Sequence, residues 1–94
     1  MDDIAGWRKC IDEIDTSLVE LLNERARCAL EIGKIKAMNG MQIFNPVRER
    51  EIFTNVFQKN KGPLSDHALL RIIKRIIEEC RNLEKNTGQH GLSQ

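Results

Sequence analysis

The sequence predicts an all-α domain built from three helices. Its apolar residues recur at alternating steps of three and four, the spacing of one face of a helix. Only two of the 94 residues are proline, and 31% are charged against 40% hydrophobic, a mixture typical of a mainly helical chain. A chain of this length forms one domain at most, and so small a helical domain often completes its core by pairing with a second copy.

The N-terminal segment predicts one long helix from about Asp3 to Met38, which ends at Asn39-Gly40, a typical C-terminal stop. At about 1.5 Å per residue this helix is more than ~50 Å long, longer than a globule of this size is wide. The rest of the chain cannot cover it, so we expect a second copy to cover its apolar face. That face carries a heptad seam of Ile4, Trp7, Ile11, Ile14, Leu18, Leu21, Arg25, Cys28, Ile32 and Ile35.

Two shorter helices are predicted to follow. Asn45 caps the second helix and Pro46 takes its first position, and the helix fades at residues 59–63. Ser65 caps the third helix, with Asp66 in its first turn, where negative charge suits the helix dipole. The predicted buried faces are Glu49, Ile52, Phe53 and Val56 in the second helix, and Leu69, Ile73, Ile76, Ile77, Cys80 and Leu83 in the third. Residues 1–85 form the predicted domain, and the polar, glycine-containing residues 86–94 form a predicted flexible tail.

Composition excludes several classes of function. The formal net charge is only +1, which argues against a nucleic-acid binder, because such a protein needs a surplus of cations. No apolar run reaches membrane length and no signal-peptide segment is visible, so we expect a cytoplasmic protein that binds no membrane. The three cysteines are odd in number and lack CxxC spacing, so we expect reduced thiols.

Three polar residues interrupt the apolar pattern, and a functional site is expected where they lie. Arg25 stands on the seam, Lys36 follows 11 residues later within about 20° of the same face, and Glu84 follows Cys80 by four. Each has a structural explanation when taken alone. Arg25 would fix the register of a coiled coil, Lys36 would complement the helix dipole, and Glu84 would lie in a frayed last turn. Together they indicate one site, since three independent accidents in so small a chain are improbable.

Arg8 connects this site to a second copy of the chain. It precedes Lys36 by 28 residues, about 42 Å along one helix, so no small ligand touches both residues in one chain. In an antiparallel pair that crosses near residue 19, Arg8 of one copy lies opposite residue 30 of the other, between Arg25 and Lys36. Three cations in a dry pocket require anions, so a small di-acid is the expected ligand.

Four segments carry a resemblance to a known family: WRKCIDEIDTSLVELLNERA, GKIK, NPVRERE and IIEECRNLE. Across residues 3–85 the chain resembles the all-helical chorismate mutase family. The resemblance implies an intertwined homodimer of three-helix chains with two active sites built from both subunits. It also implies the conversion of chorismate to prephenate, an isomerase reaction of phenylalanine and tyrosine biosynthesis, with no cofactor and no metal.

The resemblance also implies roles for individual residues. Arg8 of the second copy and Arg25 would hold the substrate carboxylates. Lys36 would bind a carboxylate and the ether oxygen of the breaking bond. Arg48 would support the anionic end, and Glu49 would orient the ring hydroxyl.

At three further positions the residue differs from the one that is common in the family, so its role need not follow the family pattern. Asn45 stands where Asp is common, so it contacts the hydroxyl through its backbone or only caps the second helix. Cys80 occupies a position where a small polar residue is frequent, and its role as a substrate-binding residue stays open. Glu84 stands where many members have Gln, which donates to the ether oxygen opposite Lys36. A glutamic acid can donate only when protonated, so activity is expected to rise as pH falls.

The implied chemistry fits these residue types. A Claisen rearrangement is unimolecular and needs neither a nucleophile nor proton transfer, so the protein has to position the substrate and stabilise developing charge. Lys36, Glu84 and Arg25 are therefore the predicted catalytic residues. His67 and His90 fall in a helix start and in the tail, away from the site.

Other functions remain open at this point. An isochorismate pyruvate-lyase shares the fold and the cationic pocket, although Arg48 and Glu49 favour the mutase. A non-catalytic regulatory or interaction module of an aromatic-pathway enzyme is a second alternative. A coiled coil that only dimerises is disfavoured, because Arg25, Lys36 and Glu84 all face inward.

Overall fold

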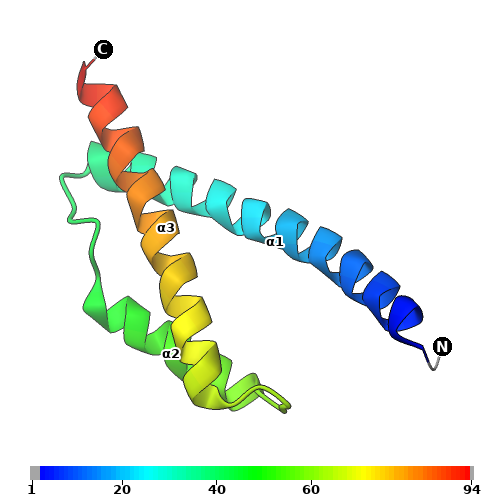
Figure 1. Ribbon diagram of the computed structural model, residues 1–94. Helices are drawn as coiled ribbons and strands as arrows, with labels where there is room; N and C mark the ends of the chain where they lie inside the picture. The colour runs from blue at the N-terminus through cyan, green and yellow to red at the C-terminus, as the bar shows by residue number, and fades with distance from the viewer. Residues whose placement is uncertain (1–2, 94) are drawn as a thin grey trace.

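The computed structural model describes the backbone of residues 3–93 and the side chains of residues 3–86. It contains α1 (Ile4–Met38), α2 (Pro46–Lys59) and α3 (Asp66–Ser93), with 35, 14 and 28 residues (Figure 1). No strand occurs in residues 3–93, so the prediction of an all-α chain of three helices is confirmed. None of the described helices is long and apolar enough to cross a membrane.

α1 has well-defined ends. Asp3 is the N-cap, and its side chain accepts a hydrogen bond from the Gly6 N–H at 2.8 Å. At the other end the Met41 N–H donates to the Lys36 carbonyl at 2.9 Å and the Gly40 N–H donates to the Ala37 carbonyl at 3.4 Å. These are the two bonds of a Schellman motif, which requires a left-handed residue, and Gly40 has a φ of +64°. The chain therefore turns directly after Lys36.

The starts of α2 and α3 follow their predicted caps. The Asn45 side chain accepts from the Arg48 N–H at 3.1 Å, and the Ser65 hydroxyl accepts from the Ala68 N–H at 3.1 Å. We expected α3 to end near residue 85, but it continues to Ser93, since no proline interrupts this segment. Side chains from residue 87 onward lie outside the described part of the chain, so a flexible tail at 86–94 stays a prediction.

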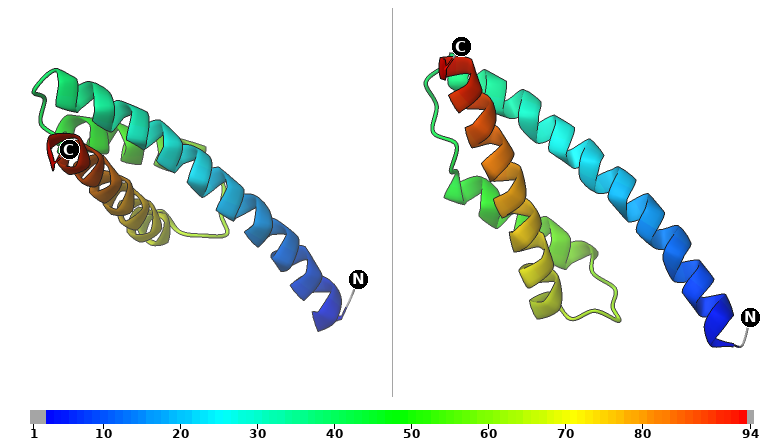
Figure 2. Two further views of the ribbon diagram at one scale, coloured as in Figure 1. Left: turned by 90° about the horizontal axis from the view of Figure 1, so that it is seen from above. Right: turned by 45° about the horizontal axis from the view of Figure 1, so that its top comes forward.

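α3 packs against both other helices (Figures 1 and 2). It crosses the C-terminal half of α1 and lies beside α2, whereas the N-terminal half of α1 extends away from the rest of the chain. The buried apolar side chains are Ala29 on α1 and Ile77 and Cys80 on α3, so the small core lies where these two helices meet.

The heptad seam of α1 is largely uncovered in the single chain. All residues from 11 to 20 are exposed, and Trp7 and Ile14 keep 59% and 64% of their surface. The radius of gyration is 16.8 Å, whereas a compact chain of this length has about 12 Å. The prediction that the rest of the chain cannot cover the seam is confirmed.

Candidate active site

A cavity of about 420 Å³ lies between the C-terminal half of α1, the first half of α2 and the middle of α3. It is the pocket in which the structure gathers most of the predicted site. Of the eight residues predicted to bind substrate, seven line it: Arg25, Lys36, Asn45, Arg48, Glu49, Cys80 and Glu84. They come from all three helices and from the linker between α1 and α2.

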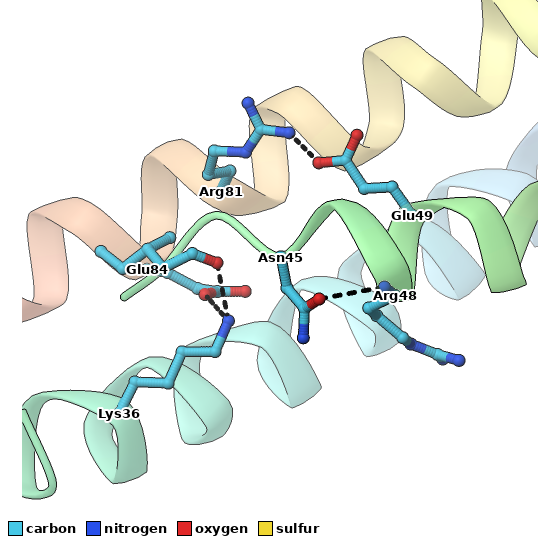
Figure 3. Close-up of polar contacts among 7 residues, drawn as sticks. Lys36, Asn45, Arg48, Glu49, Arg81 and Glu84 are labelled. Carbon is cyan, nitrogen blue, oxygen red and sulfur yellow. Dashed lines mark hydrogen bonds and ion pairs between the residues drawn. The ribbon is translucent and has the colours of Figure 1, made fainter. Parts of the chain in front are cut away.

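Lys36 and Glu84 form the ion pair at one end of this pocket. The Lys36 ammonium donates to the Glu84 carboxylate at 3.1 Å and to the Ile43 carbonyl at 2.8 Å, and Figure 3 shows the two side chains pointing toward each other from α1 and α3. Their side chains are only 15% and 12% exposed. The alternative that Glu84 lies in a frayed, solvated turn is therefore wrong. An ammonium has three donors, so among these contacts one N–H of Lys36 is left for a ligand.

Gly33 explains why the two helices come close enough for this pair. A Cβ atom built on Gly33 would lie 3.0 Å from the Glu84 Cα and 3.2 Å from its Cβ. The missing side chain lets the backbone of α3 approach α1 one turn before Lys36. A glycine inside a helix is unfavourable by about 1 kcal/mol relative to alanine, and here it provides the close crossing that places Glu84.

Arg25 is held by Cys80. The guanidinium Nη1 donates to the Cys80 Sγ at 3.1 Å, and Cys80 is buried between α1 and α3. Sulfur is a weak acceptor, and no carboxylate of the described residues forms an ion pair with Arg25. A half-buried cation with so weak a partner favours an anionic ligand. In this structure Cys80 thus orients Arg25.

Asn45 and Arg48 lie at the start of α2. The Asn45 side chain is committed to the helix cap, as one of its two predicted roles requires. The Arg48 side chain is 59% exposed, and its guanidinium pairs with Glu51 at 3.4 Å. In Figure 3 this side chain points away from Lys36 and Glu84. Exposed pairs of this kind contribute about 0–1 kcal/mol, so Arg48 can exchange Glu51 for an anion in the pocket at little cost.

Arg81 is a pocket residue that the sequence reasoning missed. Its guanidinium donates to the Glu49 carboxylate and lies over the Phe44 ring, 4.7 Å from the ring centroid. The signal that could have found it is the spacing that singled out Glu84. Arg81 follows Ile77 by four residues, just as Glu84 follows Cys80, so it prolongs the buried stripe of α3.

The charges of the pocket suit an anion with two negative charges. Four cationic side chains and two carboxylates line it, which leaves a formal charge of +2. The carboxylates pair with Lys36 and Arg81, so Arg25 and Arg48 are the cations that no pocket carboxylate neutralises. No group of three or more His, Cys, Asp or Glu side chains in the described residues is placed to hold a metal ion. That no metal or cofactor takes part stays a prediction.

Arg8 is the one predicted residue that does not line the pocket. Its side chain is exposed on the N-terminal half of α1, and it lies 28 residues, about 42 Å, from Lys36 along the helix. One chain therefore cannot bring Arg8 to its own pocket.

A family model described as chorismate mutase type II matches residues 7–85 of the chain. A bifunctional chorismate mutase/prephenate dehydratase of Aquifex aeolicus is 43% identical over 89 residues, which are 90% of this chain and 25% of that protein. A chorismate mutase of Methanocaldococcus jannaschii is 31% identical over 86 residues, covering 90% of this chain and 87% of that protein. The chain thus spans about a quarter of the bifunctional relative and most of the other.

Solved structures show the same fold. Chorismate mutase form II from Thermus thermophilus superposes with a TM-score of 0.86 at 30% identity, over 87% of this chain and 93% of that one. Chorismate mutase from Helicobacter pylori in complex with prephenate superposes with a TM-score of 0.82 at 28% identity, over 89% of this chain and 91% of that one.

Proposed function

The chain belongs to the chorismate mutase type II family, and on that premise we propose that it is an isomerase that rearranges chorismate to prephenate. Lys36 carries this proposal, because it faces Glu84 inside the pocket and has an N–H left for a ligand. The Helicobacter pylori relative was solved with prephenate, which supports prephenate as the product here. The reaction belongs to phenylalanine and tyrosine biosynthesis, which is the basis for placing the protein in the cytoplasm.

The pocket supplies what a unimolecular rearrangement needs. Arg25 and Arg48 are the cations available for the two carboxylates of the substrate, and they fix its folded conformation, which lowers the entropic part of the barrier. Lys36 donates its remaining N–H to the ether oxygen, where negative charge develops as the carbon–oxygen bond breaks. Glu84, in its protonated form, donates to the same oxygen. These groups stabilise the transition state without entering a covalent step.

We propose further that the active form is a homodimer, with Arg8 of each copy completing the pocket of the other. The chain exposes 7666 Å², whereas a compact monomer of its 10.8 kDa mass exposes about 5,500 Å². The excess of roughly 2,100 Å² per chain is in the range of obligate homodimer interfaces. Much of it belongs to the uncovered seam of α1, which a second copy with the same seam fits.

The experiment that tests the reaction is the turnover of chorismate by wild type and by Lys36→Ala, with prephenate identified as the product. Loss of a preorganised donor to the developing charge is expected to lower kcat by about 10²–10³-fold. Lys34→Ala is the matched control, since Lys34 lies on the same helix with its side chain 57% exposed and, among the described residues, pairs only with exposed Glu31. It should keep wild-type turnover.

Either of two results would contradict the proposal. One is a wild-type chain that is folded and dimeric by circular dichroism and size-exclusion chromatography but leaves chorismate unchanged. The other is a Lys36→Ala variant that is as active as Lys34→Ala. Release of pyruvate from isochorismate, without prephenate formation from chorismate, would assign the pocket to a lyase.

A further inference from the structure

On the side of the pocket away from Lys36, a cluster of three side chains links α3, α2 and the segment between α1 and α2. Arg81 on α3 donates through Nη2 to Oε2 of Glu49 on α2, and its guanidinium lies over the ring of Phe44 in the linker. The charged side chains are 25% and 21% exposed. Figure 3 shows Arg81 and Glu49 pointing toward each other across the gap between the two helices.

We propose that Arg81 is a positioning residue, which holds the Glu49 carboxylate in the orientation in which it receives the ring hydroxyl of the substrate. This inference rests on the proposed function and adds to it a residue that contacts no reacting atom. Arg81 acts through Glu49.

The cluster restrains the Glu49 carboxylate through one of its two oxygens. Arg81 binds Oε2, and the planar guanidinium is itself supported by the aromatic face of Phe44, an arrangement that favours arginine over lysine. Oε1 accepts no hydrogen bond among the described contacts, so it is the atom left for a hydroxyl donor. A glutamate side chain has substantial rotamer entropy, and ordering it before the substrate arrives removes that cost from binding.

Other cations compete for Glu49 if Arg81 is removed. Arg48 and Arg50 flank it in sequence, both exposed at the start of α2, where the helix dipole also attracts a carboxylate. Arg81 instead holds the Glu49 carboxylate toward α3.

The charge of Arg81 is already matched by Glu49, which distinguishes it from the other pocket arginines. A neutral pair adds nothing to the net charge that attracts a di-anion, whereas Arg25 and Arg48 have no carboxylate partner in the pocket. The effect of Arg81 on the reaction should therefore depend on the presence of Glu49.

A double-mutant cycle on the full chain tests this dependence. Arg81→Met should lower kcat/KM for chorismate about 10-fold, and Glu49→Gln about 10- to 100-fold, the range for a hydrogen bond to a charged group. The double variant should be no worse than Glu49→Gln alone. Arg75→Met is the matched control, because Arg75 pairs with Glu78 and Glu79 on the exposed face of the same helix, and it should leave kcat/KM unchanged.

A substrate analogue that lacks the ring hydroxyl separates positioning from a general effect on the fold. Arg81→Met should lose its 10-fold defect with this analogue, because Glu49 then has no hydroxyl to receive. Arg81→Lys keeps the charge without the planar fork and should recover part of the activity toward chorismate.

Two results would overturn the inference: an equal loss for Arg81→Met in the wild-type and Glu49→Gln backgrounds, or an equal loss with chorismate and with the analogue. Failure of the proposed function is recognised separately, by a wild-type chain that does not turn over chorismate. In that case the same four chains are compared by calorimetry for the dissociation constant of chorismate, and additive effects there overturn the role of Arg81.

Discussion

Glu84 can donate a hydrogen bond to the substrate only when its carboxyl carries a proton. Its Oε2 accepts a hydrogen bond from Lys36 in the structure. The ether oxygen of chorismate can only accept a hydrogen bond. An ionised Glu84 has no proton to donate to it, whereas the protonated carboxyl has one.

The pH dependence of the reaction tests this reasoning. The fraction of protonated Glu84 grows as pH falls, so wild-type kcat/KM is expected to rise from neutral toward acidic pH. Glu84→Gln carries an amide that donates at every pH, and its profile should rise less. Steady-state kinetics of both chains across this range decide the matter, and indistinguishable profiles would exclude a donating Glu84.

The sequence predicted which residues line the pocket better than it predicted the direction of their side chains. Arg25, Lys36 and Glu84 could be found because each places a charge on an apolar stripe. The direction of Arg48 could not, since its guanidinium follows a neighbour, Glu51, on the exposed face. Arg81 follows the same stripe rule and was still missed, because its partners Glu49 and Phe44 lie 32 and 37 residues earlier in the chain.

Among the helices, the crossing of α1 and α3 decides the geometry of the Lys36–Glu84 pair. The crossing depends on Gly33, where even a methyl group would lie 3.0 Å from the Glu84 Cα. A backbone atom inside a helix cannot move aside alone, so a side chain here displaces α3 as a unit.

Gly33→Ala is expected to separate activity from stability. Alanine adds about 1 kcal/mol of helix propensity, which offsets the strain of the crossing, so Tm should change by only a few degrees. The shift of Glu84 away from Lys36 should lower kcat about 10-fold, since small misplacements of catalytic groups are expensive. Thermal unfolding and kcat are measured together, and unchanged turnover would show that the crossing tolerates a methyl group.

Helix starts were better predicted than the end of α3. Asp3, Asn45 and Ser65 act locally, because each cap bonds a backbone N–H three residues away, and such short-range chemistry is visible in sequence. The end of α1 at Gly40 is equally local. Beyond residue 85 no such signal exists, since polar residues are compatible with a helix as well as with a tail.

At the scale of the whole molecule, the elongated shape and the bare seam of α1 are the features to explain. A chain measuring 55 × 28 × 15 Å with so little buried apolar surface has a core that is incomplete by itself. The seam could be predicted from the heptad repeat, whereas the crossing point of two copies depends on contacts that one sequence does not specify.

Mixing two inactive variants tests whether pockets are shared between copies. Arg8→Ala and Arg25→Ala should each abolish most activity as homodimers. In a heterodimer one pocket lacks both arginines and the other has both, so refolding the variants together at equal amounts should restore about a quarter of wild-type activity. A mixture no more active than its components would mean that Arg8 serves its own chain or none.

The uncovered seam has a consequence for how this protein responds to dilution. If the pocket needs Arg8 from a second copy, then the catalyst is itself the product of an association equilibrium, and it obeys mass action. Below the dissociation constant of the dimer, halving the protein concentration should cut the rate by nearly fourfold rather than twofold, and chorismate should oppose the loss by binding the assembled form. The amount of active site in a cell would then depend on how much of the chain is made, with no regulatory ligand required.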